Sequence, residues 1–63
     1  MDKYYNVVVR RKDNGREAVV ENIFAESPED AGFKALDWAD AETDIHALAE
    51  DLEVVEITEV PAN

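Results

Sequence analysis

The stretch KYYNVVVRRKDNGREAVVENIFA, residues 3–25, consists of two runs rich in β-branched and aromatic residues that meet at Asn14-Gly15. Asn-Gly is the preferred centre of a two-residue type I′ turn, because both positions of that turn need a positive φ. The stretch therefore predicts a β-hairpin at the start of the chain.

Two registers of this hairpin are compatible with the sequence. A two-residue loop places Val9 opposite Val20 and gathers one apolar face, which consists of Tyr5, Val7, Val9, Ala18, Val20 and Phe24. A three-residue loop over 13–15 brings Val19 and Ile23 beside Val7 and Val9 instead, because a one-residue slip exchanges the two faces of a strand. We expect the first register. In either register apolar residues remain on the second face, which is then available to a partner or a second copy.

A helix is predicted to follow the hairpin, over about 28–40. Ser27 is a good N-cap, Pro28 suits the first helical position, and Glu29 and Asp30 lie near the positive end of the helix dipole. At 100° per residue one arc of the helix is apolar and small, and it consists of Ala31, Gly32, Ala35, Leu36, Trp38 and Ala39. We expect this arc to pack on the sheet, with Trp38 in the core.

Phe33 falls outside that arc, among Asp30, Asp37 and Asp40. Two interpretations remain open. The segment that follows the helix covers Phe33, or Phe33 is an exposed aromatic ringed by carboxylates, the arrangement of an interface anchor with a polar rim.

The remaining segments complete a β-β-α-β order. Ile45, Leu48, Ala49 and Leu52 have helical spacing, which predicts a short second helix over about 44–51, with Thr43 or Asp44 as its cap. The run LEVVEITEV predicts a last strand over about 52–60. We expect one α+β domain over 1–63. Its three-stranded antiparallel sheet has the order 2-1-3, with the main helix on one face.

Net charge narrows the function classes. The chain carries 16 acidic and 6 basic residues, for a net charge of −10. Residues 1–16 are locally basic, whereas the other 47 residues hold Lys34 against 14 carboxylates. Direct binding of nucleic acid is disfavoured because phosphates require a basic surface. Either the acidity forms a partner-binding face, or it serves solubility or life in a salt-rich cytoplasm.

The chain offers little material for chemistry or for membrane insertion. It has one histidine, one serine, no cysteine and no glycine-rich loop, so we expect neither an enzyme nor a cofactor. The alternation of Asp40, Glu42, Asp44 and His46 lacks the pattern of a calcium loop and predicts a solvated acidic turn, with adventitious cation binding at most. The N-terminus reads as a strand rather than a signal peptide, so we expect a cytoplasmic protein without a membrane segment.

Residues 24–37, F-A-E-S-P-E-D-A-G-F-K-A-L-D, lie between the hairpin and the strand VVEITEVP. In this order the chain resembles small β-β-α-β phage proteins, and among them the T7-type phage inhibitors of bacterial RNA polymerase. The resemblance implies a non-enzymatic protein that acts on a host protein in the host cytoplasm. The resemblance also implies binding arginines on the last strand, but the last strand here has no arginine. Residues 40–51 have no counterpart in that family, so no functional residue is transferred.

Together these features predict an inhibitor or modulator that places an acidic surface in a basic groove of a host protein, such as RNA polymerase or a DNA-binding defence complex, in place of nucleic acid. The residues expected to bind are Asp30, Phe33, Asp37, Asp40, Glu53, Glu56 and Glu59. The alternative is a small homo-oligomeric structural or accessory protein whose acidity serves solubility.

Overall fold

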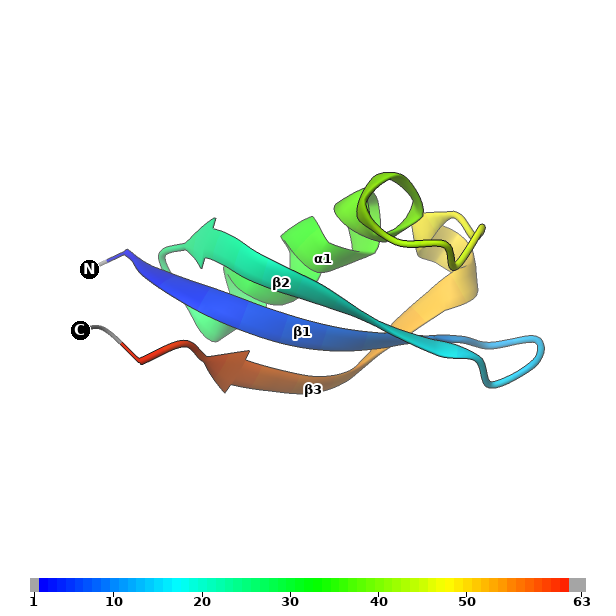
Figure 1. Cartoon of the computed structure of the whole chain (residues 1–63), viewed down its shortest axis with the longest axis horizontal. Helices are drawn as coiled ribbons and strands as arrows, with labels where there is room; N and C mark the ends of the chain where they lie inside the picture. Colours follow the sequence, from blue (N-terminus) through cyan, green and yellow to red (C-terminus); the bar gives the residue numbers. More distant parts are fainter. Residues whose placement is uncertain (1, 62–63) are drawn as a thin grey trace.

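The computed structural model describes residues 2–61 as three strands and one helix. The elements are β1 (Lys3–Arg11), β2 (Glu17–Ala25), α1 (Pro28–Glu42), a 3-10 turn η1 (Ala49–Asp51) and β3 (Leu52–Glu59). The strands form an antiparallel sheet in the order β2-β1-β3, and α1 covers one face of it (Figure 1). The predicted α+β fold, strand order and main helix are confirmed.

The hairpin closes through a longer loop than either predicted register allows. The Arg11 N–H donates to the Arg16 carbonyl at 2.8 Å, and the Gly15 N–H donates to the Arg11 carbonyl at 2.9 Å. The loop therefore consists of residues 12–15, and Gly15 alone among them has a positive φ, of 75°. The two-residue type I′ turn was wrong, and Val9 lies opposite Ala18 rather than Val20.

A bulge in β2 changes which residues of that strand face the helix. The register of β1 against β2 shifts between Tyr5 and Val7, where Asn22 takes a φ of 58°. Before the bulge Val20 is buried as predicted, but after it Ile23 and Ala25 point into the core. Phe24, predicted to lie in the core opposite Tyr5, instead lies opposite Tyr4 and is about half exposed.

The ends of α1 are fixed by side-chain caps. The Ser27 hydroxyl accepts from the Asp30 N–H at 3.1 Å, and Pro28 is the first helical residue, as predicted. At the other end the Thr43 hydroxyl donates to the Ala39 carbonyl at 2.6 Å and accepts from the Ile45 N–H at 3.2 Å. Thr43 therefore ends α1 instead of beginning a second helix.

The core between α1 and the sheet is built from small helix residues and large strand residues. Ala31, Ala35 and Ala39 are fully buried against Val7, Val9, Val20 and Ile23. Trp38 is 41% exposed, so the prediction that it fills one end of the core is wrong. Small side chains let α1 lie close to the sheet, which leaves little room for an indole beneath it. Ile45, fully buried, belongs to the core cluster.

Residues 44–48 have no regular secondary structure, so the predicted second helix over 44–51 is wrong. His46 has a φ of 53°, which is incompatible with a right-handed helix. The Arg11 guanidinium donates to the carbonyls of Ile45 and His46 at 3.1 and 3.3 Å, which uses groups that a helix would bond internally. Only η1 remains of the predicted helix. Among the described residues, no helix has the length and apolar content needed to cross a membrane.

Candidate functional site

Phe33 is the most exposed large apolar side chain in residues 2–61, with 72% of its surface accessible. Of its two interpretations, the structure therefore favours the exposed aromatic, since residues 44–51 leave the ring open. Glu29 and Asp37 lie four residues to either side of Phe33, and Asp40 lies seven residues beyond it, so the three carboxylates share its side of α1. We call Glu29, Phe33, Asp37 and Asp40 the acidic helix face.

A shallow apolar groove runs beneath Phe33, between α1 and β3. Its volume is about 270 Å³, and its lining consists of Glu29, Gly32, Phe33, Leu36, Val54 and Ile57. Gly32 has no side chain, and a Cβ built there would lie 3.5 Å from the Ile57 Cδ1 atom. We call this hollow the β3 groove. It gives the exposed ring an apolar floor.

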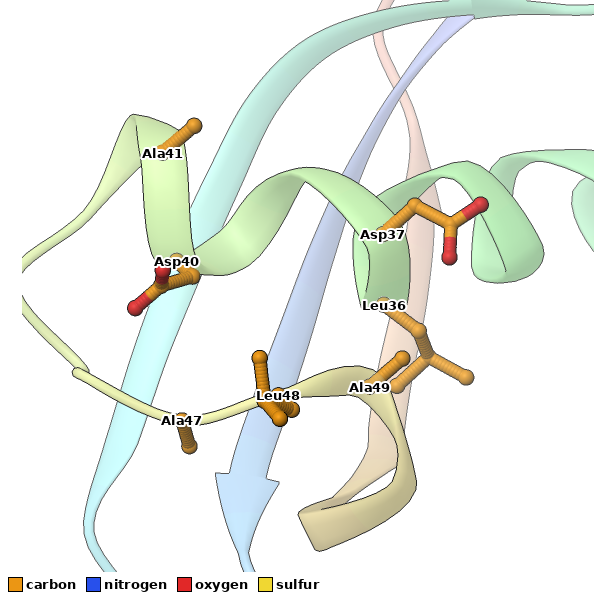
Figure 2. Close-up of a pocket in the computed structure, with 7 residues that line it drawn as sticks. All are labelled: Leu36, Asp37, Asp40, Ala41, Ala47, Leu48 and Ala49. Carbon is orange, nitrogen blue, oxygen red and sulfur yellow. The ribbon is translucent and has the colours of Figure 1, made fainter.

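A second hollow, of about 320 Å³, lies nearer the C-terminal end of α1. Figure 2 shows the helix residues on one side of it and Ala47, Leu48 and Ala49 on the other, with the Leu36 and Ala49 side chains pointing toward each other. Asp37 and Asp40 belong to its helix wall, and Leu36 lines both hollows. The acidic helix face is thus bordered by two hollows that meet at Leu36.

The structure brings together three of the seven predicted binding residues, Phe33, Asp37 and Asp40. Asp30 is directed elsewhere: its carboxylate accepts from the Glu26 N–H at 3.4 Å and pairs with Lys34 at 3.3 Å. Lys34 in turn donates to the Phe24 carbonyl of β2 at 2.8 Å. Asp30 therefore lies toward β2, whereas the β3 groove lies toward β3.

The three glutamates of β3 are divided between the two faces of the sheet. Glu53 lies opposite Arg10 and pairs with it at 2.8 Å, and Glu56 lies opposite Val8. Because Val9 and Val7 face α1, these two glutamates belong to the open face of the sheet. Glu59 lies opposite Tyr5, on the helix side, and pairs with Lys3 at 3.3 Å. The strand and helix carboxylates do not form one surface.

Most of the negative charge has no cationic partner within the described residues. Five of the 16 acidic side chains form ion pairs there, with Lys3, Arg10, Arg11, Arg16 and Lys34. Lys12, the sixth basic residue, donates to the Glu50 carbonyl at 3.2 Å. The basic cluster of the hairpin is thus engaged internally, and eleven carboxylates, including Glu29, Asp37 and Asp40, face solvent without an ion pair to any residue in 2–61.

Sequence reasoning missed the floor of the site. Gly32 and Leu36 were assigned to the core, and Val54 and Ile57 were not distinguished from other strand residues. Their role depends on where α1 crosses the sheet, and the helical and strand periodicities alone do not contain that information. Apolar residues do remain on the second, open face of the sheet, as predicted, and Phe24 joins them instead of the core: the Tyr4 and Phe24 ring centroids lie 5.1 Å apart there, and Val19 is half exposed.

The carboxylates of the acidic helix face are not gathered into a metal site. Across residues 2–61 no three acidic or histidine side chains are grouped to hold a metal ion. The clear shifts lie at the hairpin tip, where a hydrogen bond from Arg11 lowers the pKa of Asp13 and the same bond raises the pKa of Arg11. This pair stabilises the loop and lies outside the acidic helix face.

Comparison of the chain with known protein families, with curated proteins and with solved structures gives no match.

Proposed function

We propose that this chain is a non-enzymatic inhibitor or modulator that binds a basic groove of another protein through the acidic helix face. The observation that carries the proposal is Phe33, a 72% exposed aromatic with carboxylates on both sides and an apolar groove below it. Carboxylates attract a basic partner over long range, and burial of the ring supplies affinity. As the resemblance to phage proteins implies, the partner is a host RNA polymerase or DNA-binding complex whose groove otherwise holds nucleic acid.

The positions of the carboxylates support a binding role better than a stabilising one. Asp40 and Glu42 lie at the C-terminal end of α1, without a basic residue among 39–42. Negative charge at that end of a helix interacts unfavourably with the helix dipole. These carboxylates cost stability where they are, which is consistent with a surface selected for an interaction.

The proposal is tested by capture from a bacterial lysate on immobilised protein at low salt, followed by elution with a salt gradient and identification of the eluted proteins. Phe33→Ser should reduce the affinity of the captured complex tens of fold, since burial of a phenylalanine contributes about 2 kcal/mol. Asp37→Asn with Asp40→Asn should shift elution to lower salt.

Matched variants on the other side of the molecule serve as controls. Phe24→Ser removes a half-exposed aromatic from the open face, and Glu17→Gln with Glu21→Gln removes the same charge from exposed positions of β2. Both should leave capture nearly unchanged. Equal losses from the two charge pairs, or undiminished capture by a folded Phe33→Ser protein, would show that the acidic helix face is not the binding surface.

A homo-oligomeric accessory protein is the second candidate, and the open face of the sheet favours it. Tyr4, Val19 and Phe24 each expose about half of their surface there. Copies with a charge of −10 repel each other, so self-association should strengthen as salt is added, whereas binding to a basic partner should weaken. Sedimentation at low and high salt distinguishes the two candidates, because a protein that is monomeric under both conditions is not a homo-oligomer.

A further inference from the structure

Within residues 2–61, the backbone groups on the outer edge of β3, beside the β3 groove, have no hydrogen-bond partner. The Val60 N–H donates to the Tyr4 carbonyl at 2.8 Å, and Glu59 lies opposite Tyr5. Because bonded and non-bonded pairs alternate along an antiparallel ladder, Ile57 and Glu59 direct their N–H and C=O groups away from β1. β3 is the last strand of the sheet on that side (Figure 1). These groups therefore face outward.

At Ile57, the side chain lines the β3 groove and the backbone groups face outward from the same edge of the sheet. The side chain lines this groove together with Gly32, and Ile57 lies opposite Val7, on the helix side. In a fourth strand paired to this edge, the residue opposite Ile57 would direct its side chain to the same side, beneath Phe33. The residues before and after it in the added strand would direct their side chains to the open face, near Glu56.

The opposite edge of the sheet is less suited to accept a strand. In β2 the ladder is interrupted by the bulge at Asn22, and Lys34 donates to the Phe24 carbonyl at 2.8 Å. Bulges and covering side chains are the features by which edge strands avoid pairing. On β3 the register is regular from Glu56 to Glu59, and its bulge lies earlier, near Val54.

Charge determines which strand fits. Glu53, Glu56 and Glu59 all belong to β3, which has no basic residue, so two β3 edges from separate copies would place carboxylates against carboxylates. We propose that β3 accepts an extended segment of a partner protein as a fourth strand, with apolar residues toward the β3 groove and basic residues toward Glu56. This inference rests on the proposed function and specifies its binding mode as strand addition.

The test uses a capped heptapeptide of alternating lysine and valine, and a twin whose valines are N-methylated. The two have equal charge and similar apolar surface, but the twin lacks the N–H groups that would pair with β3. The unmethylated peptide should bind at least tenfold more tightly, and it should slow amide exchange at Ile57 and Glu59 at least tenfold, as observed by NMR. Equal binding of both peptides, or unchanged exchange at these amides, overturns strand addition.

Two variants of the protein provide a second, matched comparison. Glu59→Pro removes an outward N–H, and Glu59→Thr removes the same carboxylate but keeps that N–H. Glu59→Pro should bind the unmethylated peptide about tenfold more weakly than Glu59→Thr does. Equal affinities of the two variants for this peptide would also overturn the inference. Should both peptides bind equally while Phe33→Ser still weakens lysate capture, strand addition fails and the proposed function stands. Should capture be independent of Phe33, the proposed function itself fails.

Discussion

Asn22 is the residue that decides which side chains of β2 enter the core. Its φ of 58° and the hydrogen bond from its N–H to the Asn6 Oδ1 atom at 3.0 Å form the bulge that turns Ile23 and Ala25 inward. Asparagine tolerates the left-handed region, whereas a β-branched residue does not. Asn22→Val should therefore lower the free energy of unfolding by about 1–2 kcal/mol.

Urea unfolding of Asn22→Val beside Asn22→Gly checks this prediction. Glycine adopts the same φ without strain, so it should cost much less than valine. If the two variants are equally stable, the left-handed conformation is not what fixes the bulge.

The same residue explains how far the hairpin could be predicted from the sequence. Alternation places Tyr5, Val7, Val9 and Val20 on the core face, and all four are buried. A count of alternating positions assumes an uninterrupted ladder, so it carries Phe24 into the core. The sequence contains the asparagine, but an asparagine in a strand is not specific enough to reveal a bulge before the strand pairing is known.

At the scale of elements, the helix boundaries illustrate what local signals can and cannot decide. Ser27-Pro28 fixes the start of α1 because its capping groups are adjacent in sequence. Thr43 is ambiguous, since a threonine caps the end of one helix or the start of the next with the same hydroxyl. The choice depends on Ile45 entering the core and on Arg11, 34 residues away, bonding the Ile45 carbonyl. No local pattern contains that contact.

The attachment of the hairpin tip to residues 45–46 should depend on pH through Asp13. Arg11 donates to both Asp13 carboxylate oxygens, at 3.0 and 2.8 Å, and this hydrogen bonding lowers the pKa of Asp13 in the folded state. A carboxylate with a depressed pKa adds stability above its unfolded value, about pH 4, and loses that contribution as pH falls through the folded value. Asp13→Asn should therefore be less stable than wild type at pH 6, and the gap should close below pH 4.

Urea unfolding of both proteins across that range measures this difference in stability, because pH effects that the two proteins share cancel in it. A gap that stays constant down to pH 2 would mean that the Asp13 carboxylate does not contribute through its charge.

For the whole molecule, the unpaired carboxylates oppose folding and favour binding. A compact chain 36 × 18 × 17 Å in extent with a charge of −10 brings like charges within a few ångströms to tens of ångströms of each other. At about 0.01 M salt the Debye length is about 30 Å, so this repulsion is nearly unscreened. At about 1 M salt the Debye length is about 3 Å, so the repulsion is largely screened. Salt weakens the five ion pairs too, but surface ion pairs contribute little each.

The melting temperature should therefore rise from about 0.01 M to about 1 M NaCl, because screening relieves more repulsion than it removes attraction. A variant with Glu17, Glu21, Glu26 and Glu50 changed to glutamine should start from a higher melting temperature and gain less from salt. A melting temperature that falls with salt would show that the ion pairs outweigh the repulsion. Because the same salt should weaken capture of a basic partner while it strengthens the fold, loss of binding at high salt would not come from unfolding, and it would report on electrostatic attraction to the partner.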